Sequence, residues 1–129
     1  MAEQKKPPIT KSFGYAFEGI FTCIRKERNM KIHVTVTLLV VIAGLVLGLS
    51  VMEWCICLAL FGLVMALELV NTAVEAVVDM VTEAFHPLAK IAKDTAAGAV
   101  LIAAIMAAIA GLIIFVPKGL LFLKMLFGW

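Results

Sequence analysis

The sequence predicts an all-α integral membrane protein, with an N-terminal amphipathic surface helix followed by three transmembrane helices. Of its 129 residues, 64% are hydrophobic and 16% are charged, whereas soluble domains average about 45–50% and about 25%. The mean hydropathy is +1.09. A chain this short cannot bury so much apolar surface within itself, because small domains keep much of their surface exposed. We therefore expect lipid to surround the chain.

Charge and cysteine content exclude several other classes. The formal net charge is +2, and no basic cluster alternates with aromatic residues as in nucleic-acid-binding surfaces. The three cysteines are an odd number, and two of them lie in an apolar run, so no disulfide framework is expected. No P-loop motif and no zinc-ligand spacing occur. A nucleic-acid partner is not expected.

The N-terminal part predicts a flexible lead-in and a helix at the membrane surface. Residues 1–11 contain two adjacent prolines and no periodic apolar pattern, so they are expected to be flexible. From residue 12 to residue 25, apolar side chains recur at helical spacing with charged ones off the stripe. This segment is too polar to cross a membrane, and no soluble core is available for it to pack on. A helix lying on the bilayer is therefore predicted.

Three further segments, which together with the surface helix form a domain over residues 12–118, are predicted to cross the membrane. Residues 32–52 and 95–116 are each long enough at about 1.5 Å per residue to cross a hydrocarbon layer of about 30 Å. The apolar run from Trp54 to Leu67 is too short alone, so the second span must continue through Glu68 and Glu75 to about residue 82. Pro117 is expected to end the third span, and the apolar tail 119–129 is expected to lie along the outer surface.

Positive charge near the span ends predicts the orientation, because cytoplasmic loops carry an excess of lysine and arginine. The turn between the first two spans contains Glu53 and no basic residue. The N-terminal arm and the loop before the third span are therefore expected to be cytoplasmic. Their basic residues near the span ends are Arg25, Lys26, Arg28, Lys31, Lys90 and Lys93.

A polar stripe on the second span is the strongest functional signal. Glu68, Asn71, Glu75 and Asp79 are spaced by three, four and four residues and therefore share one helix face. Such groups inside a membrane usually face a bundle interior or a water-filled cleft. A seam that holds helices together is the alternative, although such seams rarely stack carboxylates. Counted from Trp54, Glu68 lies about 21 Å inward and Glu75 about 32 Å, so the stripe opens at the cytoplasmic face.

These residue types fit phosphoryl transfer. Mg²⁺ commonly takes one or two carboxylates together with substrate phosphates, and Glu27 and Glu75 are the predicted pair. Lys93, at the start of the third span, is placed to bind phosphate, although an anchoring lysine at the membrane boundary would look the same. Glu68 is the deepest carboxylate and is predicted to be a general base for an alcohol that arrives from the lipid.

The segments ELVNTAVEAVVD (68–79) and AKDTAAGAV (92–100) resemble the prokaryotic diacylglycerol kinase family of small integral membrane lipid kinases. The likeness extends from Gly14 to Pro117. The segments ERNMKIH (27–33) and HPLAKIAKDTAAGAV (86–100) are more similar to the Gram-positive branch, whose members phosphorylate undecaprenol. The resemblance implies a homotrimer with active sites shared between neighbouring protomers.

The resemblance also implies roles for individual residues. Glu68 matches the catalytic base, and Asn71 matches an active-site asparagine; both would contact the lipid substrate. Glu27 and Glu75 match the metal-binding carboxylates. A basic residue that some members carry before the surface helix corresponds to about Pro8, and Lys11 is expected to replace it in substrate binding. The residues implied in ATP binding are Tyr15, Glu27, Glu75, His86, Lys93 and Asp94.

We therefore expect an ATP-dependent, Mg²⁺-assisted lipid-alcohol kinase in the bacterial plasma membrane, with its active site at the cytoplasmic face. Its expected partners are the lipid alcohol, ATP, membrane lipids and further copies of itself. Undecaprenol is the expected acceptor, and diacylglycerol is the alternative. A small proton-coupled transporter, which would also use an intramembrane glutamate, is the alternative of another class.

Overall fold

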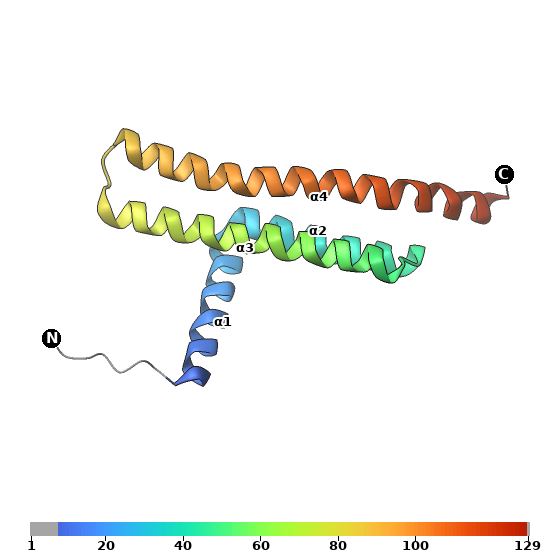
Figure 1. Cartoon of the computed structure of the whole chain (residues 1–129), viewed down its shortest axis with the longest axis horizontal. Coiled ribbons are helices and arrows are strands. Elements are labelled where there is room, and N and C mark those ends of the chain that lie inside the picture. Colours follow the sequence, from blue (N-terminus) through green and yellow to red (C-terminus); the bar gives the residue numbers. More distant parts are fainter. Residues whose placement is uncertain (1–7, 129) are drawn as a thin grey trace.

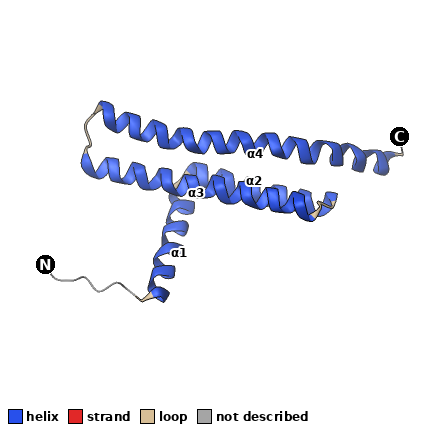
Figure 2. Cartoon of the chain, in the orientation of Figure 1, coloured by secondary structure: helices blue, strands red, loops and turns tan. Residues whose placement is uncertain are grey.

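Four α-helices make up the chain (Figure 1). The structure is a computed structural model and describes residues 8–128. The helices are α1 (Ile9–Lys26), α2 (Arg28–Leu47), α3 (Val51–Val81) and α4 (Pro87–Phe127). No strand occurs within this described range (Figure 2). The predicted all-α class is confirmed, whereas residues 1–7 of the expected flexible N-terminus lie outside the described residues.

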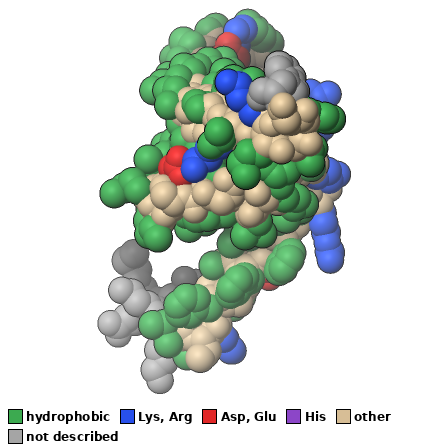
Figure 3. Space-filling view, turned by 90° about the vertical axis from the view of Figure 1, so that its right-hand side faces the viewer, with side chains coloured by type: hydrophobic (Ala, Val, Ile, Leu, Met, Phe, Trp, Pro, Cys, Tyr) green, Lys and Arg blue, Asp and Glu red, His purple; other side chains and the backbone are tan. Residues whose placement is uncertain are grey.

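Helices α2, α3 and α4 are each long and apolar enough to cross a membrane. α3 and α4 pack side by side, and α2 packs against both of them (Figure 1). Hydrophobic side chains cover most of the face shown in Figure 3, and most large apolar residues of the spans are exposed. Such a surface requires lipid or further protein around it, since monomers in water rarely expose large apolar patches.

α1 projects away from the bundle and meets it near its own C-terminal end (Figure 1). Cys23 is 2% exposed, and its Sγ lies 3.3 Å from Oγ1 of Thr72 on α3. α1 begins at Ile9, three residues before the predicted start, because Pro8 precedes it and accepts the amide hydrogen bond of Lys11 through its carbonyl oxygen. Lys11 is therefore helical, whereas the sequence predicts a flexible segment there.

α2 ends before the predicted limit of residue 52, because a tight turn follows Leu47. Gly48 has φ +67°, the left-handed conformation that commonly closes a helix. Ser50 then starts α3 with a capping box. The Ser50 amide donates to Oε2 of Glu53 at 2.7 Å, and the Glu53 amide donates to Oγ of Ser50 at 3.3 Å. The uncharged run of the sequence thus contains a turn, and α3 extends over 51–81.

α4 is much longer than the predicted span 95–116. His86 caps its start by accepting a hydrogen bond from the amide of Leu88 on Nδ1 at 3.2 Å, and Pro87 occupies the first helical position. The predicted stop at Pro117 is wrong, because residues 117–127 continue the helix. Proline removes one backbone donor, and membrane helices tolerate such a loss.

Lys118 joins α4 to the turn between α2 and α3. Its Nζ lies 3.2 Å from Oε2 of Glu53 and 3.3 Å from the carbonyl oxygen of Gly48. Close by, the ring of Trp54 packs on Gly44, where an added Cβ would come within 2.8 Å of the indole. These contacts fix the end of the bundle where α2 turns into α3, which lies opposite to the α3–α4 loop (Figure 1).

Candidate active site

The predicted polar stripe begins on α3 with two buried side chains. Glu68 is 1% exposed and Asn71 is 6% exposed. Oε2 of Glu68 and Oδ1 of Asn71 have no hydrogen-bond partner among the described residues. A buried polar atom without a partner costs about 1–3 kcal/mol. A chain that keeps two such oxygens one helical turn apart has the character of a ligand-binding site.

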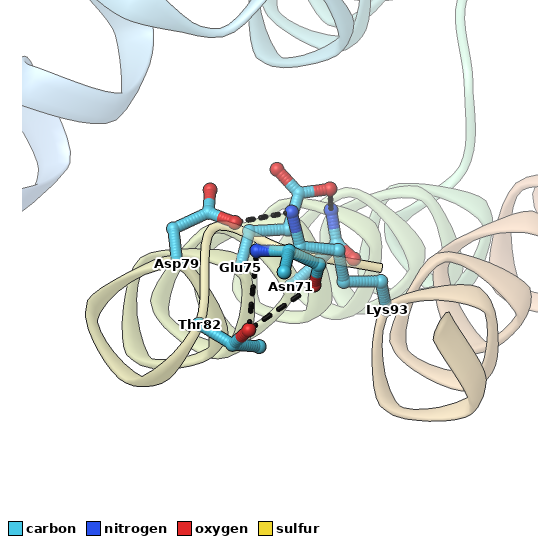
Figure 4. Close-up of polar contacts among 6 residues, drawn as sticks. Asn71, Glu75, Asp79, Thr82 and Lys93 are labelled. Carbon is cyan, nitrogen blue, oxygen red and sulfur yellow. Dashed lines mark hydrogen bonds and ion pairs between the residues drawn. The ribbon is translucent and has the colours of Figure 1, made fainter. Parts of the chain in front are cut away.

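Hydrogen bonds continue the stripe toward the α3–α4 loop (Figure 4). Nδ2 of Asn71 donates to Oε1 of Glu75 at 3.4 Å. Further along, Nζ of Lys93 on α4 lies 2.5 Å from Oδ1 of Asp79. Lys93 also lies within electrostatic range of Glu75. An ammonium group therefore stands beside the carboxylates, as the sequence predicts, and Asp79 holds it.

Glu27 approaches the stripe from the junction of α1 and α2. It is the only non-helical residue between these helices, with φ −88° and ψ 123°, and the chain turns sharply at this point (Figure 1). Its carboxylate and that of Glu75 both lie within electrostatic range of Glu68. In the described part of the chain, no group of three or more His, Cys, Asp or Glu residues could hold a metal ion.

A cavity of about 210 Å³ opens onto Glu68 and Asn71. Its walls come from α2, which contributes Asn29 and His33, from α3, and from α4, which contributes Val100 and neighbouring apolar residues. The cavity gives the unpartnered oxygens room for a small polar group. It combines one buried carboxylate, two side-chain amides and one imidazole, which can accept, donate and relay a proton.

Four predicted residues stand apart from this cluster. Asp94 is exposed and pairs with Lys90 on the same helix. His86 is exposed and caps α4. Tyr15 is 60% exposed, and Lys11 is also exposed. Both lie on the part of α1 that projects from the bundle (Figure 1).

Sequence reasoning misses two residues of the cavity wall. The sequence indicates only a membrane-boundary residue at His33 and no role for Asn29. Both line the cavity together with Glu68. Their spacing of four residues at the start of a span is a usable signal, because it puts two polar side chains on one helix face. Thr72, whose hydroxyl donates to the carbonyl oxygen of Glu68 at 2.9 Å, has no such signal.

Comparisons with known proteins identify the family and several relatives of this chain. The family described as "Prokaryotic diacylglycerol kinase" matches residues 14–115. An undecaprenol kinase of Bacillus subtilis is 48% identical over 108 residues, which cover 84% of this chain and 88% of the relative. A diacylglycerol kinase of Synechocystis sp. is 44% identical over 117 residues, covering 90% and 67%. The Escherichia coli diacylglycerol kinase is 34% identical over 101 residues, covering 78% and 83%.

Proposed function

Because this chain belongs to the prokaryotic diacylglycerol kinase family, we propose that it transfers the γ-phosphoryl group of ATP to the hydroxyl of a membrane lipid alcohol. Undecaprenol is the acceptor we propose first, because the relative with 48% identity is named an undecaprenol kinase. Diacylglycerol is the second candidate, since other relatives are named diacylglycerol kinases. All three of these relatives are named kinases, which favours this activity over the transporter alternative.

The buried Glu68 is the observation that carries the proposal. Its Oε2 makes no hydrogen bond within the described residues and is therefore available to accept the proton of a lipid hydroxyl. The hydroxyl oxygen then bonds to the γ-phosphorus, the bond between that phosphorus and the β–γ bridging oxygen breaks, and ADP leaves. Asn71, one turn away, orients the reacting groups. Phosphoryl transfer depends mainly on positioning and charge stabilisation, which a small bundle can supply.

Glu27 and Glu75 would hold Mg²⁺ on the nucleotide side of Glu68. Two carboxylates suit this ion, which keeps several water ligands and binds substrate phosphates, so the lack of a larger protein cluster in the described residues is compatible with it. When bound, the ion neutralises phosphate charge. Lys93 would bind phosphate after exchanging its partner Asp79, which is 64% exposed and weakly held. Tyr15, His86 and Asp94 are the proposed contacts to the rest of ATP, and Lys11 is proposed to bind substrate.

We place the site at the cytoplasmic face of the bacterial plasma membrane, where ATP is found. The basic residues of the α1–α2 junction and of the α3–α4 loop support this orientation. A homotrimer remains our proposal for the assembly. The extensive exposed apolar surface of the spans supports it, and a neighbouring copy would bring Tyr15 or Lys11, which project from one protomer, toward another site.

Transfer of label from γ-labelled ATP tests the activity. The full chain would be reconstituted in vesicles that contain equal amounts of undecaprenol and diacylglycerol, with Mg²⁺ or with a chelator. We expect Mg²⁺-dependent label in extracted undecaprenyl phosphate and little label in phosphatidic acid. Predominant labelling of phosphatidic acid would show that diacylglycerol, and not undecaprenol, is the acceptor. The absence of labelled lipid of either kind would refute the kinase proposal.

A further inference from the structure

A second, larger cavity meets the one that contains Glu68. It has a volume of about 560 Å³ and is a groove between α2, α3 and α4. Val40 of α2, Phe61 of α3 and Ala108 of α4 are among its walls. His33 and Ala104 line both cavities, so the groove adjoins the cavity of Glu68, and these two residues lie at the junction.

The groove offers almost nothing to a polar group. Of the described residues that line it, His33 and Thr37 alone carry nitrogen or oxygen in their side chains. The Thr37 hydroxyl is already donated to the carbonyl oxygen of His33 at 2.8 Å. His33, at the junction, therefore provides the available side-chain donor. Beyond it, a polar atom of a ligand would lie without a partner, at a cost that hydrocarbon does not incur.

This distribution matches one kind of acceptor. In a polyprenol, the hydroxyl group is followed directly by hydrocarbon. In diacylglycerol, one ester group is attached to the carbon next to the hydroxyl-bearing carbon and a second to the carbon beyond it, so both would enter the apolar part of the groove. We propose that the groove holds the hydrocarbon chain of a polyprenol, and that His33 at its inner end hydrogen-bonds the hydroxyl and directs it to Glu68. This inference rests on the proposed kinase function and makes His33 a substrate-binding residue.

Gly111 permits a test of the groove that leaves the site of Glu68 intact. It lines the groove seven residues from Ala104, about 10 Å along α4. A Cβ added at Gly111 meets no atom within 4 Å, so Gly111→Leu is expected to fold and to narrow the groove. Gly62→Leu is the matched control, because Gly62 also has free space, is exposed and lines neither cavity.

The measurement compares KM values for undecaprenol and for the short prenol geraniol in reconstituted vesicles. We expect Gly111→Leu to raise the KM for undecaprenol about tenfold, which is equivalent to losing the burial of about two methylene groups. The KM for geraniol should stay nearly unchanged. Gly62→Leu should change neither. If Gly111→Leu does not accumulate, Gly111→Val places a smaller side chain at the same point of the groove and makes the same comparison.

Replacement of His33 tests the hydroxyl contact separately. We expect His33→Leu to raise the KM for undecaprenol about tenfold without changing the KM for ATP, and His33→Gln, which keeps a donor, to recover most of the loss. Equal increases in both KM values, or no recovery by glutamine, would show a structural role and overturn this contact.

Three outcomes would overturn the proposal that the groove holds the hydrocarbon chain of a polyprenol. An active wild type whose chain-length dependence is unchanged by Gly111→Leu would place the lipid elsewhere. Loss of the oligomer in Gly111→Leu, seen by cross-linking, would show that a neighbouring copy fills the groove. A wild-type protein that phosphorylates no alcohol would refute the kinase function itself. The assay of the wild type alone distinguishes this outcome from the first two.

Discussion

At the level of single side chains, the open question is whether Lys93 binds phosphate or only anchors α4 at the membrane boundary. Its ion pair with Asp79 bears on this question. The two groups are 37% and 64% exposed, and exposed ion pairs contribute at most about 1 kcal/mol. An incoming phosphate can therefore displace the Asp79 carboxylate. A lysine that only marked the membrane boundary would be needed for insertion and not for turnover.

Lys93→Met is predicted to lower kcat/KM for ATP by about 10–100-fold, the value of a lost charge-assisted hydrogen bond. Asp79→Asn should change it by no more than about threefold. The measurement is phosphoryl transfer at varied ATP in vesicles, with Lys124→Met as the matched control because Lys124 lies near the opposite end of α4. Equal activity of Lys93→Met and Lys124→Met would reduce Lys93 to an anchor.

Cys23 gives a probe of how firmly α1 is held. Burial raises the pKa of its thiol, while the contact with Thr72 opposes that shift. Because the thiolate is the reactive form, we expect a maleimide at pH 8 to label Cys23 at least about tenfold more slowly in the native protein than after unfolding in detergent. The raised pKa also means that folding stability falls as pH rises through the alkaline range. Rapid native labelling, measured by peptide mass spectrometry, would show that α1 detaches from α3.

The residues of the site differ in how far the sequence could predict them. Glu68, Asn71 and Glu75 share a face because of helix periodicity alone, so their grouping on one element followed from spacing. The approach of Glu27 depends on the sharp turn between α1 and α2, and that of His33 depends on how α2 packs against α3. Neither relation is local in the sequence, and therefore the cavity itself was not predictable.

At the level of elements, the fold is secured at the end where Lys118 meets Glu53 and the carbonyl oxygen of Gly48. Lys118 and Glu53 have side-chain exposures of 28% and 25%, so water screens this pair less than a surface pair. Lys118 on α4 contacts Glu53 on α3 and the carbonyl oxygen of Gly48 at the end of α2, so it connects all three spans. These contacts lie far from Glu68 along α3.

Lys118→Met is therefore predicted to lower the free energy of unfolding by about 1 kcal/mol. The KM values for undecaprenol and for ATP should stay unchanged. Thermal unfolding in detergent, repeated with Glu53→Gln and with the double variant, measures the coupling. Strictly additive losses would mean that the two side chains do not interact in the folded protein.

Helix boundaries were the least predictable part of the elements. The number and order of helices followed from apolar length, which the bilayer fixes. The turn between the first two spans was expected at Glu53 and lies at 48–50 instead, because an uncharged turn does not interrupt an apolar run. The continuation of α4 through Pro117 was not predicted, because proline usually ends a helix in water. In a membrane, proline interrupts helices less strongly.

At the level of the whole molecule, the chain places an apolar groove, a buried carboxylate and a row of charged groups in sequence from the apolar interior toward one face. The groove shares residues with the cavity of Glu68, and Glu75, Asp79 and Lys93 lie beyond it toward the α3–α4 loop (Figure 4). Under the proposed function, this order would let a membrane-bound acceptor and a water-borne nucleotide meet at a single carboxylate.

The most direct test of that account is the turnover of Glu68→Gln beside Glu18→Gln, whose carboxylate lies exposed on α1. Both variants would be reconstituted with undecaprenol and Mg-ATP, and their thermal unfolding would be measured alongside. We predict that Glu68→Gln loses at least about 10³-fold in kcat, in the range expected for removal of a general base, and keeps its folded assembly, while Glu18→Gln stays near the wild-type rate. Full activity in a folded Glu68→Gln protein would contradict the account.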